Sequence, residues 1–415
     1  MKYNFDQVID RRGTNCVKWD EEPPVSSHLA PRTSNLVSMW IADMDFAVCP
    51  AIIDALKKRL EHPVFGYTEV SQSYYDAVKE WNQRRHNWTV ERQHIIYTSG
   101  VVPAISACIK AVTLPGDKVL VQTPVYNCFF SSIRNQGCTI EESPLIYNSL
   151  QSTNEDAVNS PSTWRGLGGG FYSIDFDAFE RRCADPKVKA FILCNPHNPA
   201  GRVWTREELQ RLGEICLKHD VFVISDEIHC EIVMPGYKYT PFASISEEFA
   251  NNCAVCIAPT KAFNIAGLQI ANIVVKNPRY YERIDRSINI HENCDVNPFG
   301  VLALEAAYKE GEPWLQEMIQ YVWENYQFLC QYLSEKAPQL TVTKLEGTYL
   351  VWVNISKLGI KAADFCTQLL EKENLWLASG EVYGETTGSD FVRINIACPR
   401  KTLQEGLERL VNALS

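Results

Sequence analysis

The sequence predicts an α/β fold in which a mostly parallel sheet is covered by helices on both faces. Short apolar runs alternate with segments of helical periodicity through much of the chain, and this alternation implies parallel strands joined by crossover helices. The 415 residues suffice for two or three domains. The longest apolar stretches, 221–225 and 270–275, have the length of strands. A membrane span needs about 20 residues, so we expect no membrane segment.

The expected elements follow in chain order. Residues 1–45 are irregular and rich in Pro, Asn and Asp, which predicts an extended arm. Pro50 suits a first helical turn, and apolar residues recur after it with helical spacing, which predicts a helix over 50–61. The next expected elements are helices near 71–87, 102–113, 126–136 and 205–219 and strands at 94–98, 118–122, 190–194 and 221–225. The helix near 205–219 opens with the capping box Thr205-Arg-Glu-Glu208.

The second half of the chain contains one interruption and a separate tail. Between Tyr147 and Tyr172 the pattern lapses into Asn, Ser, Thr and Gly, which predicts a surface insertion over 148–171. This insertion is either a surface elaboration or a lid. From Trp314 a long helical pattern runs to about Ala337. A smaller α+β domain is expected after it, with elements at 349–355, 362–374, 391–396 and 401–414.

Composition excludes several classes of protein. Forty Lys and Arg against fifty Asp and Glu give a formal net charge of −10, and no basic run appears, so nucleic acid is not an expected partner. The N-terminus lacks a secretory signal pattern, so we expect a cytoplasmic location. The fifteen cysteines are spread through apolar surroundings and read as reduced core thiols. Cys253 and Cys256 lie in a predicted strand and point to opposite faces, so no metal site is expected.

Polar residues at strand ends are the candidates for chemistry, because ligands of open parallel sheets bind there. The turn Ser99-Gly100 follows a strand and opens a helix. The backbone amides of Gly100 and Val101 would point at an anion, with glycine allowing close approach. Many strand–helix turns carry Ser-Gly for geometry alone, so anion binding and a simple turn both stay open.

Three further segments carry candidate groups. In Asn195-Pro-His-Asn-Pro-Ala-Gly-Arg202, two prolines bracket Asn198 in a rigid loop, which either presents its amide or is only a turn. Asp226 ends an apolar strand, and its burial requires a cation, from a ligand or from a salt bridge. Lys261 follows the strand that ends near Ala258, and apolar surroundings would lower its pKa toward the nucleophilic range. A lysine that extends its ammonium to solvent is the alternative there.

The order and spacing of these segments resemble one family. The Ser-Gly turn, Tyr126 after Thr-Pro-Val, the Asn-Pro-His-Asn-Pro loop, Asp226-Glu-Ile-His229, Thr260-Lys-Ala-Phe-Asn264 and a late Arg393 are similar to the class I/II aminotransferase superfamily of pyridoxal 5'-phosphate (PLP) enzymes, fold type I. The resemblance covers nearly the whole chain. Four further motifs resemble its cystathionine beta-lyase (C-S lyase) subgroup: Tyr3-Asn-Phe-Asp6, Arg11-Arg-Gly-Thr-Asn15, Met39-Trp-Ile-Ala-Asp-Met-Asp-Phe46 and Phe65-Gly-Tyr67.

The resemblance implies catalytic roles. Lys261 would hold PLP as a Schiff base and act as the base at the substrate's alpha carbon. Asp226 would pair with the pyridinium nitrogen, which supplies the cation that its burial requires. Tyr126 would stack on the ring, and Asn198 would donate to the phenolic oxygen of the ring and contribute to substrate binding. Arg393 would bind the substrate carboxylate bidentately.

The resemblance also implies a phosphate site and a dimer. Gly100, Val101 and Thr260 would bind the phosphate, and Tyr67 would reach the phosphate of the neighbouring subunit in a homodimer with shared active sites. His229 would lie beside the cofactor ring. Many relatives have an Arg eight residues after the lysine, where this chain has Gln269. The expected division is an arm over 1–45 that packs with the small domain, a large PLP-binding domain over 46–300, and an interdomain helix with a small domain over 301–415.

Three functions are compatible with these residues. The first is a PLP-dependent lyase that cleaves L-cystathionine or another cysteine S-conjugate by α,β-elimination to a thiol, pyruvate and ammonia. The second is an aminotransferase, which uses the same Lys, Asp and Arg but reprotonates the cofactor carbon. The third is a non-enzymatic regulator, which would ordinarily carry a basic DNA-binding module or lack the lysine. Neither feature is seen, so an enzyme is favoured, and the subgroup motifs favour the lyase.

Overall fold

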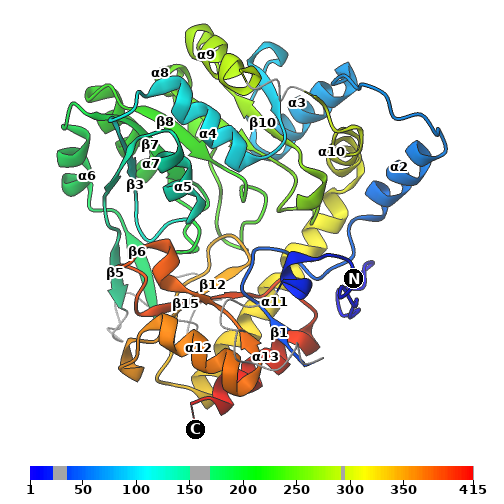
Figure 1. Cartoon of the computed structure of the whole chain (residues 1–415), viewed down its shortest axis with the longest axis vertical. Coiled ribbons are helices and arrows are strands. Elements are labelled where there is room, and N and C mark those ends of the chain that lie inside the picture. Colours follow the sequence, from blue (N-terminus) through cyan, green and yellow to red (C-terminus); the bar gives the residue numbers. More distant parts are fainter. Residues whose placement is uncertain (22–34, 150–168, 291–294, 415) are drawn as a thin grey trace.

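The computed structural model describes residues 1–21, 35–149, 169–290 and 295–414. The predicted α/β fold is confirmed, and Figure 1 shows an upper part built on a large sheet and a lower part built on a small one. The large sheet has seven strands in the order β2-β10-β9-β8-β7-β3-β4. Strands β9 to β4 pair in parallel, whereas β10 runs antiparallel to both its neighbours. The strands are β2 (Ile95–Thr98), β3 (Lys118–Val121), β4 (Thr139–Glu142), β7 (Val188–Cys194), β8 (Phe222–Asp226), β9 (Cys253–Ile257) and β10 (Ala271–Val274).

Helices cover both faces of this sheet because its strands are apolar on both sides. Along β3, Val119 and Val121 enter one core cluster and Leu120 enters the other, as the two-residue period of a strand requires. Each such burial contributes about 1.5–3 kcal/mol. The helices of the upper part are α2 (Pro50–Leu60), α3 (Gln72–His86), α4 (Val101–Val112), α5 (Cys128–Asn135), α6 (Phe176–Cys183), α7 (Arg206–Lys218), α8 (Glu247–Asn251), α9 (Pro278–Asn289) and α10 (Pro298–Glu310).

Two local predictions are confirmed within these layers. Helix α7 begins with the expected capping box, in which Thr205 Oγ1 accepts from the backbone N–H of Glu208 while the Glu208 side chain accepts from the backbone N–H of Thr205. On β9, Cys253 belongs to one core cluster and Cys256 to the other, so the two thiols lie on opposite faces of the sheet. That arrangement prevents the pair from sharing one metal ion.

The lower part of the molecule is reached through the 25-residue helix α11 (Glu312–Lys336). Its antiparallel sheet has the order β11-β12-β15-β14, with Trp352 of β12 opposite Arg393 of β15. The remaining elements here are β11 (Thr341–Val342), β12 (Leu350–Asn354), α12 (Ala362–Glu373), β13 (Leu375–Trp376), β14 (Ala378–Ser379), β15 (Phe391–Asn395) and α13 (Arg400–Asn412). The described residues contain no helix long and apolar enough to cross a membrane.

The N-terminal arm contacts the lower part. It carries the short helix α1 (Val17–Asp20) and the strand β1 (Val37–Ser38), which pairs in parallel with β13. The backbone N–H of Tyr3 donates to Glu317 on α11 at 3.1 Å. Helix α10 spans the expected boundary near residue 300 and packs on α2 and α3. The division into domains at residues 45 and 300 stays a prediction.

Strands occupy both ends of the segment 148–171, where a surface insertion was expected. The strands β5 (Ile146–Ser149) and β6 (Gly170–Ser173) pair with each other in antiparallel orientation. Tyr147 packs over this pair of strands so closely that a Cβ on Gly170 would lie 2.1 Å from its hydroxyl. Composition does not predict the second strand, because Gly170, which allows the close approach of Tyr147, is also a typical loop residue. Residues 150–168, including any lid, lie outside the described residues.

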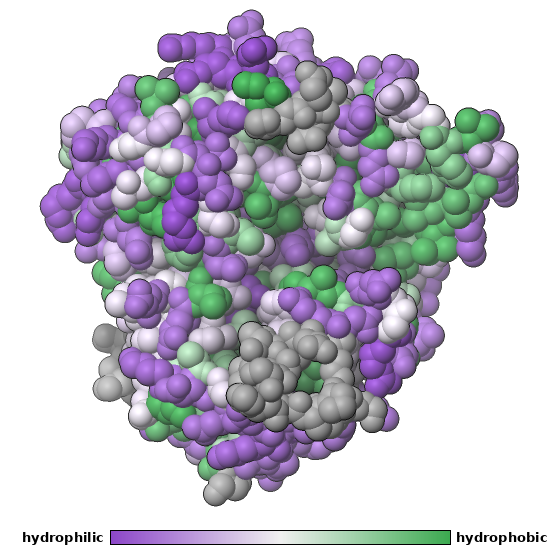
Figure 2. All heavy atoms as spheres, viewed as in Figure 1, coloured by the Kyte–Doolittle hydropathy of each residue, from purple (hydrophilic) through white to green (hydrophobic). Residues whose placement is uncertain are grey.

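An exposed apolar surface covers α2 and the loop after it. We call it the α2 patch, and its members are Ile53, Leu60, Val64, Phe65 and Tyr67. Figure 2 shows apolar side chains gathered at this edge of the molecule. Tyr67 is 99% exposed, so no described part of its own chain covers its ring. A contiguous exposed apolar surface of this kind marks an interaction site.

Candidate active site

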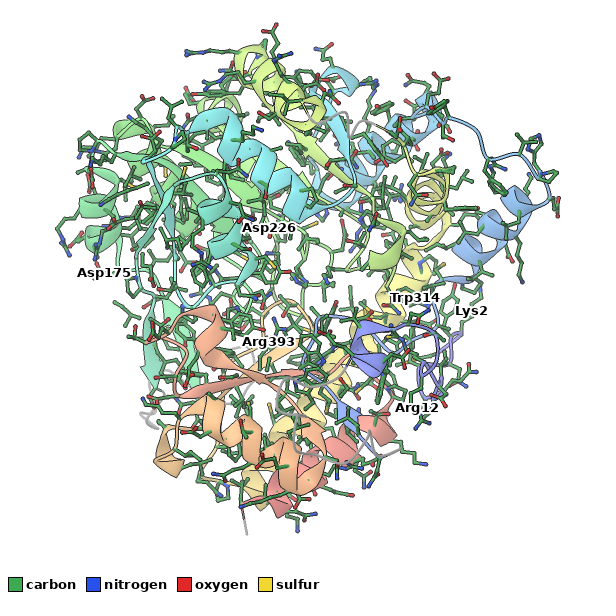
Figure 3. The ribbon with its side chains drawn as sticks, viewed as in Figure 1. Lys2, Arg12, Asp175, Asp226, Trp314 and Arg393 are labelled. Carbon is green, nitrogen blue, oxygen red and sulfur yellow. The ribbon has the colours of Figure 1, made fainter. Side chains whose placement is uncertain are left out.

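The ends of the parallel strands surround a cavity of about 320 Å³. Its wall comes from loops of the large sheet and from Ala42 of the arm. Figure 3 shows Asp226 on the side of the large sheet and Arg393 below it, in the lower part of the molecule. The loops after β2, β7, β8 and β9 each supply part of the wall, as expected for an open parallel sheet. The predicted residues that line this cavity are Gly100, Val101, Tyr126, Asn198, Asp226, His229, Thr260 and Lys261.

Asp226 is a buried carboxylate at the end of β8. Burial raises its pKa to about 7, against the lowering effects of the Ile228 backbone N–H at 3.1 Å and of the charge of Lys261. Among the residues that the structure describes, none forms a salt bridge with Asp226. The alternative of a structural salt bridge is therefore not supported, and the carboxylate is available to a cationic group of a ligand in the cavity.

Lys261 is partly buried, and its ammonium is held inside the protein by a backbone carbonyl. Its Nζ donates to the backbone carbonyl of Ala42 at 2.6 Å. Burial lowers the pKa of Lys261, and Arg393 acts in the same direction, while Asp43 and Asp226 oppose the shift. A lysine with a lowered pKa is a better nucleophile and base than an exposed one.

Arg393 and Asn198 form a pair beside the lysine. Arg393 Nη1 donates to Asn198 Oδ1 at 3.0 Å, and Nη2 donates to the Trp40 carbonyl at 2.8 Å. These two bonds fix the plane of the guanidinium, while its buried Nε has no hydrogen-bond partner. The bond from Arg393 also makes Nδ2 the donor end of Asn198. A buried cation with an unused donor fits a carboxylate ligand.

His229 and Tyr126 contribute rings to the cavity wall. Burial lowers the pKa of His229 to about 3, with Lys261 and Arg393 adding to the shift, so its imidazole is neutral. Its Nδ1 is buried without a partner. Burial also raises the pKa of the Tyr126 hydroxyl, which keeps it protonated. Both side chains therefore face the cavity as neutral groups.

The anion end of the cavity is the beginning of α4. Gly100 precedes this 12-residue helix, so the backbone amides there face the cavity together with Thr260. Gly100 has an extended backbone with φ 174°, and an added Cβ would lie 3.4 Å from Pro103, so the fold does not itself require glycine. Gln269 lines the same cavity, where it supplies an amide in place of a cation.

Two predicted site residues do not line this cavity: Tyr67 lies on the α2 patch, and Arg393 contacts the wall only through Asn198. Ala42 and Cys194 are wall residues that were not predicted from the sequence. The carbonyl of Ala42 holds Lys261, and Cys194 accepts the backbone N–H of Asn198 through Sγ at 3.4 Å. Ala42 belongs to the motif Met39–Phe46, but no local periodicity places that motif beside a lysine 219 positions away.

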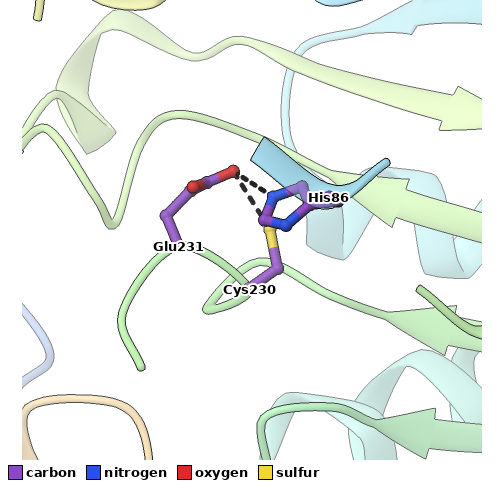
Figure 4. A group of neighbouring side chains, drawn as sticks. All are labelled: His86, Cys230 and Glu231. Carbon is purple, nitrogen blue, oxygen red and sulfur yellow. Dashed lines mark hydrogen bonds and ion pairs between the residues drawn. The ribbon is translucent and has the colours of Figure 1, made fainter. Parts of the chain in front are cut away.

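A second cluster of polar side chains, His86, Cys230 and Glu231, lies outside the cavity (Figure 4). Glu231 Oε1 accepts from His86 at 2.7 Å and from Trp81 at 2.6 Å, and Oε2 accepts from Arg85 at 3.2 Å. Burial opposes ionisation, but His86 and Arg85 lower the pKa of Glu231 to about 2. Arg85 neutralises the Glu231 carboxylate, so this cluster contains an ion pair at a buried carboxylate.

The residues of the cavity fit the cofactor that the resemblance implies. The beginning of α4 and Thr260 offer donors to a phosphate, and Asp226 offers a buried carboxylate to a ring nitrogen. Asn198 Nδ2 and the unpartnered His229 Nδ1 offer polar groups to the edge of a ring. Lys261 offers an amine inside the same cavity.

Fold and cavity together define an enzyme of the fold type I class. The family model described as aminotransferase class I and II matches residues 34–410, and the chain belongs to this family. The predicted superfamily is thereby confirmed.

Named relatives align with this chain over nearly its full length. The cystathionine beta-lyase PatB of Bacillus subtilis (strain 168) is 40% identical over 412 residues, which cover 99% of this chain and 100% of PatB. Cystalysin from Treponema denticola, whose crystal structure contains a pyridoxal 5'-phosphate cofactor, is 36% identical with a TM-score of 0.90 over 100% of this chain and 99% of cystalysin. The PLP-bound C-S lyase from Staphylococcus hominis is 31% identical with a TM-score of 0.84 over 99% of each chain.

Proposed function

We propose that the protein is a PLP-dependent carbon-sulfur lyase. It cleaves L-cystathionine or a related cysteine S-conjugate by α,β-elimination, and with one water releases the thiol, pyruvate and ammonia. The observation that carries the proposal is the 40% identity to a cystathionine beta-lyase over 99% of the chain. Two PLP-containing relatives in the same fold support the cofactor. The cavity supplies the lysine and the buried carboxylate that this chemistry needs, and the buried Arg393 contacts its wall through Asn198.

The side chains divide the reaction among them. Bound PLP supplies a ring that withdraws electrons from the alpha carbon of the substrate. Arg393 holds the substrate carboxylate through Nε and its remaining Nη hydrogens, because Asn198 and Trp40 already fix the guanidinium. Lys261 then takes the alpha proton, for which its lowered pKa suits it. Asp226 stabilises positive charge on the ring nitrogen, and the C-S bond breaks as the thiolate leaves.

The products distinguish this lyase from an aminotransferase. Purified holoenzyme given L-cystathionine and no keto acid is expected to form homocysteine, pyruvate and ammonia in equal amounts. Lactate dehydrogenase coupling reports pyruvate, and a thiol reagent reports homocysteine. An aminotransferase would instead stop after one turnover per active site until a keto acid is added. That second result would overturn the elimination and leave the role of Lys261 standing.

We further propose that the protein is a homodimer in which each subunit completes the site of the other. Tyr67 is fully exposed and lies on the α2 patch, whose apolar side chains are between 38% and 99% exposed. An isologous two-fold interface over this patch would bury it and place each Tyr67 in the partner's site. The phosphate end of the cavity has Gln269 rather than a cation, so a tyrosine hydroxyl would add a donor there. The cytoplasmic location stays a prediction.

Subunit mixing tests the shared site. A Lys261→Ala subunit mixed with a Tyr67→Phe subunit is expected to regain activity, because one site of the mixed dimer then carries both lesions and the other is intact. Recovery approaches one quarter of the wild-type rate in an equal mixture, because about half of the dimers are mixed. Elimination rates after verified subunit exchange give the measurement.

The matched control mixes Lys261→Ala with Asp226→Asn. Both residues line the cavity of their own chain, so every mixed site keeps one lesion and no recovery is expected. Equal behaviour of the two mixtures would show that Tyr67 does not reach the partner's site.

A further inference from the structure

The N-terminal motif Arg11-Arg-Gly-Thr-Asn15 is built into a compact loop that the reaction itself does not use. The Asp20 carboxylate closes this loop by accepting three backbone N–H groups, those of Gly13 at 2.9 Å, Thr14 at 3.1 Å and Cys16 at 2.9 Å. The closed loop presents Arg11, Lys18 and Trp19 to a neighbouring stretch of the arm.

The neighbouring stretch is residues 40–46, which we call the strap. Its backbone carbonyls accept side chains of the active site. The Trp40 carbonyl accepts from Arg393 at 2.8 Å, and the Ala42 carbonyl accepts from Lys261 at 2.6 Å. The two side chains come from different sheets, since Arg393 lies on β15 of the small sheet and Lys261 follows β9 of the large sheet. The strap therefore joins both sheets through the groups that the reaction uses.

Two asparagines complete the strap's contacts. Asn264, three residues after Lys261, donates from Nδ2 to the carbonyls of Met44 at 3.2 Å and Phe46 at 2.8 Å. Asn395, two residues after Arg393, donates from Nδ2 to the carbonyls of Ile41 at 2.7 Å and Asp43 at 2.8 Å. The path of the strap thus determines where each functional side chain and its neighbour in sequence are held.

Side chains of the arm loop and of helix α1 bind the strap through a buried ion network. Asp45 accepts from Lys18 at 2.7 Å, from Arg11 at 3.0 Å and from Trp19 Nε1 at 2.9 Å. Lys18 has no exposed surface, and Asp45 is 5% exposed. Arg11 also donates to Asp43 Oδ2 at 2.6 Å and to the Met44 carbonyl at 2.8 Å. Such charge-assisted bonds in a buried setting are stronger than neutral ones.

We propose that Arg11 and Lys18 are positioning residues for the active site. They hold the strap at the path on which the Ala42 carbonyl meets Lys261 and the Trp40 carbonyl meets Arg393. Functional groups keep their geometry only when their supporting contacts are themselves fixed. Loss of Arg11 releases the strap, the guanidinium of Arg393 loses its orientation, and the substrate carboxylate is bound less tightly. The inference rests on the proposed function only for the identity of the substrate.

The test uses holoenzymes of Arg11→Ala, Arg11→Lys and Arg12→Ala. Arg12 is the matched control, because it is the next residue and has the same side chain, yet it pairs with Asp10 at the surface. In Figure 3 it lies at the edge of the molecule, away from Asp226 and Arg393. Two measurements are made: binding of L-alanine, an amino acid without a leaving group, from the visible absorption of the holoenzyme, and amide hydrogen exchange of residues 40–46.

Arg11→Ala is expected to weaken L-alanine binding by about tenfold to a hundredfold, in line with loss of charge-assisted hydrogen bonds. Exchange across 40–46 is expected to become at least about tenfold faster. Arg11→Lys keeps one charged contact, so its L-alanine binding and amide exchange are expected to lie between those of Arg11→Ala and wild type. Arg12→Ala is expected to match wild type in both measurements. In steady state, KM for cystathionine rises more than kcat falls.

Two outcomes would overturn the proposal. One is that Arg11→Ala and Arg12→Ala bind L-alanine equally and exchange equally over 40–46. The other is that Arg11→Ala lowers Tm while exchange and L-alanine binding stay at wild-type values, which is the behaviour of a merely structural arm. Lys18→Met paired with Asp45→Asn provides a second, charge-neutral variant for the same measurements. A wild-type protein without lyase activity would contradict the proposed function and leave both measurements usable.

Discussion

Lys261→Ala is expected to abolish elimination. In the proposed mechanism the side chain has two tasks, holding the cofactor covalently and removing the alpha proton, and alanine performs neither. No second lysine lines the cavity, whose described wall contains Lys261 as its single amine. A positioned general base alone contributes roughly 10²–10⁴-fold, so the loss of both tasks is expected to exceed that range. Turnover of L-cystathionine, measured by pyruvate release, gives the result.

Two comparisons separate this loss from misfolding. Lys276→Ala removes a surface lysine that pairs with Glu247 at 2.6 Å and is expected to retain wild-type turnover. Addition of a small primary amine to Lys261→Ala is expected to restore a fraction of the rate, because the amine enters the space left by the side chain and accepts the proton. A Lys261→Ala enzyme with wild-type elimination would show that another group is the base.

The strand ends of the large sheet were predictable because their signals are local. Apolar runs of four to seven residues predict strands, and the position directly after each run predicts the cavity wall. Asp226 and Lys261 were found in this way before any family was considered, and both line the cavity. Their assigned roles needed the resemblance, because burial alone does not say which ligand compensates a carboxylate.

The strap was not predictable by the same reasoning. Met39–Phe46 reads as irregular chain, and its function depends on carbonyl groups, which every residue type possesses. Only the fold brings Ala42 to Lys261 and Trp40 to Arg393. The positions of Arg11 and Lys18 were equally unpredictable from the sequence, since a basic residue in an arm is normally exposed. The motifs that contain Arg11 and residues 39–46 could be matched to a family from the sequence, but their physical role follows only from their contacts in the structure.

Asp226→Asn is expected to lower turnover by roughly two to three orders of magnitude while the protein still binds PLP. The ring nitrogen needs a negative partner to stay protonated, and an amide of the same shape supplies none. Charged groups aimed at a developing charge in a buried site contribute about 3–4 kcal/mol each, or roughly 10²–10³-fold in rate. PLP content by absorbance and turnover by pyruvate release are measured on the same sample.

Glu227→Gln is the matched control for this substitution. Glu227 is the next residue, is also fully buried, and burial raises its pKa to about 7. Its carboxylate points to a different set of partners: the hydroxyls of Tyr239 and Ser225 and the backbone N–H of Phe242. Loss of one negative charge at position 227 is expected to leave turnover within about tenfold of wild type. Equal losses for the two variants would mean that general burial of charge, and not contact with the cofactor, explains the effect.

Stability without PLP gives an independent reading of the same carboxylate. The ordinary pKa of 3.8 is raised to about 7 in the folded protein, so between these values the folded state keeps a proton that the unfolded state has released. The free energy of unfolding of cofactor-free wild type therefore falls as pH rises through this window, by on the order of 4 kcal/mol in full.

Asp226→Asn lacks this cost and is expected to be the more stable apoprotein at pH 8, with a smaller difference at pH 5. Added PLP should reverse the order, because its ring nitrogen pairs with the wild-type carboxylate. Denaturant unfolding at the two pH values measures this, and a wild type as stable as the variant at pH 8 without PLP would show that Asp226 already has a cationic partner in the protein.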